Sequence, residues 1–252
     1  DLLKRPIIQI NNPELKQDLA NKVILVTGAA GSIGSEICRQ IIKHPYQHLI
    51  LVDQAESPLY DLEQEFIQVG IKNFSAIVAN IRDAHRMKTI FNKHKPQRVF
   101  HAAAYKHVPL MEDNPYEAIK VNVFGTRILA DLAIAHQVEK FVLISSDKAV
   151  NPTNVMGATK RAAEIYISSI FNTGETKFIT TRFGNVLGSN GSVIPLFKKQ
   201  IAAGGPLTLT HKDITRFFMT IPEACGLVLE AGTMGEGGEI FIFDMGMSVK
   251  II

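Results

Sequence analysis

A short apolar run that leads directly into a glycine-rich turn is the feature that most constrains the fold of this chain. Residues 22–27 read as a strand, and Gly28, Gly31 and Gly34 follow at the start of a helical pattern. Gly28 permits a tight turn, Gly31 lets the backbone approach a pyrophosphate, and Gly34 allows the helix to pack closely on the strand. The spacing predicts the first unit of a dinucleotide-binding fold.

From residue 22 onward, short runs rich in Val, Ile and Phe alternate with longer segments of helical period. This alternation predicts an α/β fold, a doubly wound parallel sheet of the Rossmann type with helices on both faces. Strands are predicted near residues 22–27, 48–53, 75–79, 98–102, 140–145 and 177–183. Helices are predicted near residues 33–44, 56–69, 83–93, 115–136 and 155–172.

The regular alternation stops after about residue 184. We therefore expect a lead-in segment over residues 1–20, an NAD-binding Rossmann domain over 21–183 and a partial substrate-binding lobe over 184–252. Both ends of the chain look cut, which suggests a piece of a longer protein. Within the small lobe, a helix is predicted near 194–203, a Thr-rich strand near 206–210 and a helix near 222–232.

Composition excludes several classes of function. The net charge of +3 is small and the basic residues are scattered among acids, so the chain lacks the basic stripe of a nucleic-acid-binding protein. Cys38 and Cys225 lie far apart in helical patterns and are expected to be buried small apolar residues, not a disulfide pair. No apolar run is long enough to span a membrane, and no signal peptide is visible.

An acidic residue at the end of the second predicted strand bears on the choice of cofactor. Asp53 lies about 20 residues beyond the last glycine of the turn, where a carboxylate can bind the ribose hydroxyls of a dinucleotide. Because a carboxylate there repels a 2′-phosphate, NAD is favoured over NADP. Asn80 and Ile81 follow the third strand and are expected beside the adenine, although a plain turn role for Asn80 is nearly as good an interpretation.

A second group of residues predicts chemistry at the end of the fifth strand. Ser146, Asp147 and Lys148 follow that strand, and Met156 and Lys160, four residues apart, share one face of the next helix. Ligands of open α/β sheets bind outside these strand ends, so the five residues can converge on one crevice. A tyrosine would be expected at position 156, and a thioether has no titratable proton to replace its phenol.

With these residues the chain resembles the extended short-chain dehydrogenase/reductase family. Within that family it is closely similar to the CapD-like nucleotide-sugar 4,6-dehydratases of polysaccharide biosynthesis. The family usually has Tyr-x-x-x-Lys in its active site, but a large subgroup resembles this chain in having methionine there and acts mostly on UDP-N-acetylglucosamine. The segments that carry the resemblance are residues 27–34, 101–112, 146–149, 182–189 and 211–216.

The resemblance implies an enzyme that oxidises C4 of the sugar, eliminates water across C5 and C6, and reduces C6. In this scheme Asp147, protonated by its surroundings, donates to the departing hydroxyl, and neutral Lys148 removes the C5 proton. Lys160 would bind the nicotinamide ribose. Ser146 would hydrogen-bond the C4 oxygen and pass its proton to Asp147, Lys148 or water.

Other residues are assigned roles by the same resemblance. We expect no metal ion, because His101 and His107 have no third ligand at suitable spacing. Asn122 is expected to hold its helix against the active-site strand or simply to pack. The expected cofactor-binding residues are Gly28, Ala30, Gly31, Ser32, Ile33, Asp53, Asn80, Ile81, Ala102, Ala103, Ala104 and Lys160. The expected substrate-binding residues are Tyr105, Lys106, His107, Asn185, Gly191, Ser192, Val193 and Arg216.

Two alternative functions remain open. A C4 epimerase would use the same cofactor site and substrate, but it would leave Asp147 and Lys148 without an elimination to perform. A non-catalytic sensor of NAD and sugar nucleotides would explain Met156 as a mark of lost activity. We also expect a homo-oligomer that binds a UDP-sugar. Residues 1–6 resemble the segment that precedes the catalytic domain in membrane-anchored members, so the domain is expected at the cytoplasmic face of a membrane.

Overall fold

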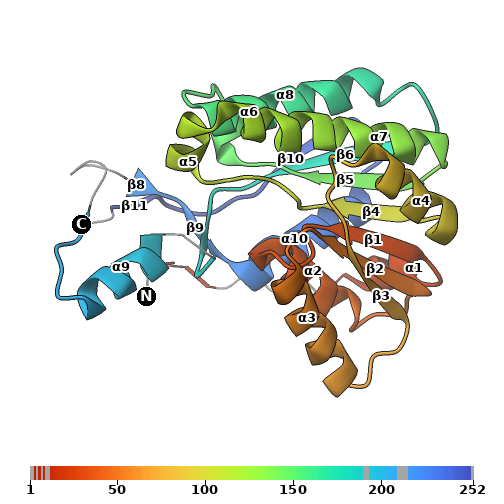
Figure 1. Ribbon diagram of the computed structural model, residues 1–252, viewed down its shortest axis with the longest axis horizontal. Coiled ribbons are helices and arrows are strands. Elements are labelled where there is room, and N and C mark those ends of the chain that lie inside the picture. The colour runs from red at the N-terminus through yellow and green to blue at the C-terminus, as the bar shows by residue number, and fades with distance from the viewer. Residues whose placement is uncertain are drawn as a thin grey trace.

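A seven-stranded parallel sheet organises the chain, and its strands lie in the order β10-β6-β5-β4-β1-β2-β3 (Figure 1). This order confirms the doubly wound fold predicted from the sequence. The computed structural model describes residues 3, 5, 6, 8, 12–189, 193–208 and 215–250, without the side chains of residues 193, 194 and 196. The strands of the sheet are β1 (Val23–Thr27), β2 (His48–Asp53), β3 (Phe74–Val78), β4 (Arg98–His101), β5 (Lys140–Ile144), β6 (Lys177–Arg182) and β10 (Ile240–Ile242).

Helices cover both faces of this sheet (Figure 1). Ile24 and Val26 of β1 pack into the layer formed with α1, α2, α3 and α10, whereas Leu25 packs into the layer formed with α4, α7 and α8. A central strand covered on both sides is apolar at most positions, which is why these strands read as nearly continuous apolar runs. The helices are α1 (Pro13–Leu19), α2 (Ser32–Ile41), α3 (Glu56–Gln68), α4 (Ala84–His94), α7 (Thr126–Ala135), α8 (Val155–Ile170) and α10 (Ile221–Met234).

The predicted secondary structure is confirmed along most of the chain. The helix predicted near 115–136 is a continuous helical run of three parts, α6 (Pro115–Ala118), the π-helical segment η1 (Ile119–Gly125) and α7. The strand predicted near 206–210 is wrong for residues 206–208, because Thr208 turns back to hydrogen-bond the side chain of Gln200. Residues 209 and 210 lie outside the described residues. The sequence patterns also missed α1 and the short helix α5 (Val108–Asp113).

Residues beyond 184 divide between two positions in the fold. Helix α10 and strand β10 return to complete the layers and the edge of the large sheet. The remainder includes two small two-stranded sheets beside the large sheet. The domain boundary expected at residue 184 stays a prediction. This remainder contains β7 (Asn185–Leu187), which pairs with β9 (Phe218–Thr220), β8 (Thr215–Arg216), which pairs with β11 (Val249–Lys250), and α9 (Val193–Ala202).

Cys38 and Cys225 are both buried and unpaired, as the sequence predicts. They belong to the layer that holds α2 and α10. Within the described part of the chain, no helix is both long enough and apolar enough to cross a bilayer.

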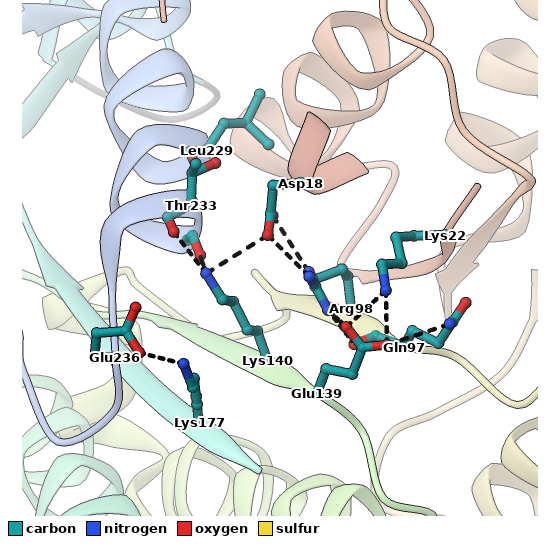
Figure 2. Close-up of polar contacts among 11 residues, drawn as sticks. Asp18, Lys22, Gln97, Arg98, Glu139, Lys140, Lys177, Leu229, Thr233 and Glu236 are labelled. Atoms are coloured by element: carbon teal, nitrogen blue, oxygen red, sulfur yellow. Dashed lines mark hydrogen bonds and ion pairs between the residues drawn. The ribbon is translucent and has the colours of Figure 1, made fainter. Parts of the chain in front are cut away.

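A partly buried network of charges joins the amino ends of the central strands to α1 and α10 (Figure 2). Arg98, at the start of β4, is only 6% exposed, and its guanidinium pairs with Asp18 of α1 at 2.8 Å and with Glu139. Lys140, at the start of β5, donates to the carbonyl oxygens of Gly232 (2.9 Å) and Thr233 (2.6 Å) at the end of α10. The network therefore fixes α1 and α10 on the sheet at the edge opposite the glycine turn.

The Asp18–Arg98 pair should contribute strongly to stability. Replacing Asp18 by Asn leaves a buried guanidinium with one carboxylate fewer, and we expect the free energy of unfolding to fall by about 3 kcal/mol. Urea unfolding measures this loss. Arg127→Gln is the matched control, because Arg127 and Asp131 form an exposed pair whose loss should change stability by less than about 0.5 kcal/mol. Equal losses in the two variants would contradict the structural role of Asp18.

Candidate active site

The glycine turn after β1 has no room for side chains. Gly28 has φ +67°, and a Cβ on it would lie 2.6 Å from the Ala103 nitrogen. A Cβ on Gly34 would lie 2.0 Å from the Gly28 carbonyl oxygen. Gly31 precedes the first residue of α2, and no side chain caps that helix. The first N–H groups of α2 are thus presented at the carboxyl edge of the sheet, where an anion such as a pyrophosphate is stabilised.

A cavity of about 310 Å³ lies over this turn. Asp53 stands at its wall, where its carboxylate accepts hydrogen bonds from the backbone N–H groups of Ala30 and Ala55, both at 2.9 Å. Asn80 uses its side chain in the turn after β3, since its Oδ1 accepts from the Arg82 N–H and its Nδ2 donates to Gln54. Most of the predicted cofactor-binding residues line this cavity: Gly28, Ala30, Gly31, Asp53, Asn80, Ile81, Ala102, Ala103 and Ala104.

A second cavity, of about 250 Å³, opens at the ends of β4, β5 and β6. Ala102 and Ala104 line both cavities, so an extended ligand can pass from one to the other. Three lysines contribute to its wall and give it a positive charge. The predicted residues that line the second cavity are Ile33, Ala102, Ala104, Lys106, His107, Ser146, Lys148, Met156, Lys160 and Asn185.

Some predicted residues lie elsewhere. Tyr105 lines the first cavity, on the expected cofactor side. Ser32 begins α2 but lines neither cavity. Asp147 does not line the second cavity, although its neighbours Ser146 and Lys148 do. Arg216 pairs with Val249 in a small two-stranded sheet and lines neither cavity. Gly191 and Ser192 lie outside the described residues, as does the side chain of Val193.

Ser146, Asp147 and Lys148 form one hydrogen-bonded group at the end of β5. The Ser146 hydroxyl donates to Asp147 Oδ1 at 2.8 Å, and Lys148 Nζ donates to the same oxygen at 3.0 Å. The side chains of Asp147 and Lys148 remain 43% and 31% exposed, so the two groups form an ion pair open to solvent. Asn185 of β7 accepts a second bond from Lys148 Nζ at 3.3 Å. The neutral forms of Asp147 and Lys148 expected from the sequence stay a prediction.

Met156 and Lys160 are buried side by side on α8. Met156 is 2% exposed and packs against Met111, Ala118 and the loop containing Tyr105. Lys160 Nζ donates to the Ile144 carbonyl oxygen at 2.8 Å. Burial lowers the pKa of Lys160 to about 8, against a smaller raising effect of the Glu164 carboxylate. A buried ammonium beside an apolar thioether can bind oxygen atoms of a ligand, but Met156 itself cannot transfer a proton.

Buried polar side chains hold these elements together. Asn122 of η1 accepts a hydrogen bond from the Tyr105 N–H and donates both to the Tyr105 carbonyl and to Thr159 of α8. It therefore fixes the loop after β4 to η1 and α8, a positioning role close to one of those expected from the sequence.

His101 takes part in a second buried chain of hydrogen bonds. Its Nδ1 lies 2.7 Å from the Thr27 hydroxyl, and its Nε2 lies 2.9 Å from the Thr126 hydroxyl, which donates to the Asn122 carbonyl. Because Thr126 uses its proton there, His101 carries its own proton on Nε2 and accepts at Nδ1. Burial, and to a smaller extent Lys160, lowers the pKa of His101 to about 3, so the ring is neutral. Among the described residues, no group of three His, Cys, Asp or Glu side chains is placed to bind a metal.

The sequence patterns assigned no role to several residues of the second cavity, although these residues lie in the segment 182–189 that carries the family resemblance. Phe183, Gly184, Val186 and Ser189 line it, and the Asp147 N–H donates to the Phe183 carbonyl oxygen at 3.1 Å. These residues follow β6, so the general rule that strand ends bear the site of an open sheet is the signal that could have found them.

The pH dependence of stability should report the burial of Lys160. In the unfolded chain this amine keeps a pKa near its ordinary value of 10.5, above the value of about 8 in the folded chain. Between these values the unfolded state binds more protons, so the wild type gains stability relative to Lys160→Met as pH rises from 8 to 10.5. The gain should reach about 3 kcal/mol. Urea unfolding of both proteins across this range measures it, and a constant difference between them would contradict the buried ammonium.

Comparison with known proteins assigns the chain to a family of polysaccharide biosynthesis proteins. The family described as Polysaccharide biosynthesis protein matches residues 24–252. The chain is 52% identical over 255 residues to the capsular polysaccharide biosynthesis protein CapD of Staphylococcus aureus, a match that covers 100% of this chain and 43% of CapD. The chain therefore spans less than half the length of that relative.

Two further relatives are named for different reactions. The chain is 38% identical over 229 residues to a UDP-glucose 4-epimerase of Rickettsia rickettsii, covering 88% of this chain and 66% of the relative. It is 35% identical over 226 residues to an inverting UDP-N-acetylglucosamine 4,6-dehydratase of Campylobacter jejuni, again covering 88% and 66%.

Among solved structures, Pen from Bacillus thuringiensis matches with a TM-score of 0.87 at 37% identity, over 92% of this chain and 71% of Pen. The dTDP-glucose 4,6-dehydratase DesIV of Streptomyces venezuelae, solved with NAD and TYD bound, matches with a TM-score of 0.82 at 22% identity, over 90% and 77%. The second likeness concerns the fold alone.

Proposed function

The chain belongs to the polysaccharide biosynthesis protein family, and from that premise we propose that it is an NAD-dependent nucleotide-sugar 4,6-dehydratase. Its substrate would be UDP-N-acetylglucosamine, and its product a 4-keto-6-deoxy sugar nucleotide for surface polysaccharide. The observation that carries the proposal is the contact between Asp147 and Lys148 beside a cavity that also contains Met156. An acid and a base within 3.0 Å of each other suit elimination of water from adjacent carbons.

NAD fits the first cavity. The N–H groups at the start of α2 suit its pyrophosphate, and the Asp53 carboxylate suits a ribose diol. Bound NAD would supply the hydride acceptor for C4 and the hydride donor for C6. Lys160, buried in the wall of the second cavity, would bind the nicotinamide ribose and add positive potential where the C4 oxygen becomes a ketone.

Ser146 offers a route for the proton of the C4 hydroxyl. Its own hydroxyl already donates to Asp147 Oδ1, so a proton accepted from the sugar can pass on to the carboxylate. Lys148 is 31% exposed and can release a proton to solvent. Together these two transfers convert the ion pair into a neutral carboxylic acid and a neutral amine, and a sugar that covers the pair would favour those neutral forms.

The neutral pair can then perform the elimination. Lys148 removes the C5 proton, which the C4 ketone has acidified, and Asp147 protonates the C6 hydroxyl as it leaves as water. The pair returns to its charged state as the carbon–carbon double bond forms. When C6 is reduced, Lys148 can return a proton to C5. If the Lys148 ammonium has exchanged its protons with solvent, the proton delivered to C5 is a solvent proton.

An epimerase is the second candidate, and one relative bears that name. It would need reversible oxidation at C4 only, with no acid for the C6 hydroxyl. The shared bond of Ser146 and Lys148 to one carboxylate oxygen favours dehydration instead. A non-catalytic sensor is disfavoured by the same group, because binding alone requires no relay.

The remaining expectations stay proposals. The diphosphate of the substrate would be bound by Asn185, Gly191, Ser192, Val193 and Arg216, whose charge and backbone amides suit it. Location at the inner face of a membrane, through an upstream segment, and assembly into a homo-oligomer are proposed from the family resemblance.

Mass spectrometry of UDP-N-acetylglucosamine incubated with the protein and NAD tests the reaction. In deuterated solvent we expect the sugar nucleotide to lose one water and to gain one deuterium at C5. Asp147→Asn cannot protonate the leaving hydroxyl and should lower the rate by at least about 100-fold, whereas the control Asp61→Asn, at an exposed position of α3, should not. A C4 epimer of unchanged mass would establish the epimerase, and binding without reaction would favour the sensor.

Asp53 should decide which dinucleotide binds. Asp53→Asn removes the charge that repels a 2′-phosphate and keeps one oxygen for the ribose. We expect NAD to bind about tenfold more weakly and the preference for NAD over NADP to fall. Isothermal titration with both dinucleotides measures this change. An unaltered preference would show that Asp53 serves only the backbone of the turn.

A further inference from the structure

Residues of the lead-in segment contact the far end of the chain next to the proposed active site. Arg5 pairs with Glu223 of α10 at 2.6 Å, and the side chains are 16% and 0% exposed. Glu223 also accepts hydrogen bonds from the Ile8 N–H at 2.7 Å and from Thr220. Burial alone would raise the pKa of Glu223, but the bonds from Arg5, Ile8 and Thr220 outweigh it and lower the pKa to about 2. The carboxylate is therefore ionised and firmly held.

Arg5 also braces the segment that follows β10. Its Nε donates to the Met245 carbonyl oxygen at 3.4 Å. Its aliphatic stem passes against Gly246, which has φ +73° and where a Cβ would lie 3.0 Å from Arg5 Cδ. The ion pair of Arg5 with Glu223 attaches the side chain to α10, and its contacts with Met245 and Gly246 attach it to the segment after β10. Arg5 therefore fixes the position of Met245 relative to α10.

Met245 in turn contacts the wall of the second cavity. It is 7% exposed, and its sulfur accepts a hydrogen bond from the Gly184 N–H at 2.9 Å. The space beside Gly184 is bordered by two groups, because a Cβ there would lie 3.1 Å from the Met245 sulfur and 3.2 Å from Asp147 Oδ2. The stacked rings of Phe183 and Phe243, 5.5 Å apart, hold the two segments together. Met245 and the Asp147 carboxylate therefore occupy the same side of Gly184, where Met245 limits the space that the carboxylate can enter.

We propose that Arg5 is a positioning residue for the dehydration, acting through Met245 and Gly184 on the placement of Asp147. The inference rests on the proposed function. Without Arg5, Met245 and Gly184 can move away from Oδ2, and the carboxylate gains freedom to leave Ser146 and Lys148. A small misplacement of a catalytic group lowers the rate of the chemical step while leaving substrate binding largely intact.

The contact also links the lead-in segment to catalysis. Leu3 is buried with Phe218 of β9 and Val249 of β11, so it also engages the part of the chain expected to bind substrate. A displacement of the lead-in segment would be transmitted to Asp147 by the same contacts. The segment is in this sense part of the active-site support.

Steady-state kinetics of three variants of the full chain, residues 1–252, test the proposal. Arg5→Met and Met245→Leu should each lower kcat for UDP-N-acetylglucosamine about tenfold with KM changed less than about twofold. Arg5→Lys keeps the charge and should recover part of the loss. Met245→Leu keeps the apolar volume, so it remains informative if Arg5→Met folds poorly. Arg127→Met, on an exposed pair of α7, is the control for loss of an arginine.

Hydrogen exchange provides a readout that does not depend on activity. In Arg5→Met and Met245→Leu, the Gly184 amide should exchange about tenfold faster than in the wild type and in Arg127→Met. If the wild type is active and both variants keep its kcat, or if the Gly184 amide exchanges at the wild-type rate in both variants, the positioning role of Arg5 is overturned. The proposal that the protein is a dehydratase would not be affected. Wild type that binds but does not dehydrate the sugar would overturn the proposed function and the catalytic role of Arg5 together.

Discussion

The close approach of three backbone segments at Gly28, Gly34 and Ala103 is the constraint on which the site depends. At Gly34 a Cβ would overlap the Gly28 carbonyl, and at Gly28 it would overlap the loop after β4. Because no side chain fits, α2 begins directly at the edge of the sheet and the alanine run crosses beside it. The first cavity lies over this close approach of the three segments. Ala102 and Ala104 line both the first and the second cavity, and so connect them.

Charge is arranged differently in two groups of the candidate site. Lys160 is buried in the wall of the second cavity and donates to a backbone carbonyl, and burial lowers its pKa to about 8. Asp147 and Lys148 form a partly exposed ion pair beside that cavity. Under the proposed function, a bound sugar would cover this pair and favour its neutral forms. Met156 lines the same cavity without competing for protons.

The sequence predicted those features that depend on local periodicity. The strands that are covered on both faces read as apolar runs, and the spacing from Met156 to Lys160 placed both side chains on one face of α8. It could not predict contacts between distant segments. The return of β10 to the sheet, the pair formed by Asp18 and Arg98, and the approach of Met245 to Gly184 join residues whose local patterns carry no sign of one another. The hydrogen bonds by which Asn122 of η1 fixes the backbone of Tyr105 are a further contact of this kind.

The most direct test of the account follows the hydrogen at C4 of the sugar. UDP-N-acetylglucosamine carrying deuterium at C4 would be incubated with the protein and NAD in ordinary water, and the product analysed by NMR. Dehydration by Asp147 and Lys148 predicts that the deuterium moves within one molecule to the new methyl group at C6. Deuterium recovered at C4, in the starting sugar or its epimer, would contradict the account, because the Asp147–Lys148 pair would then have no elimination to perform.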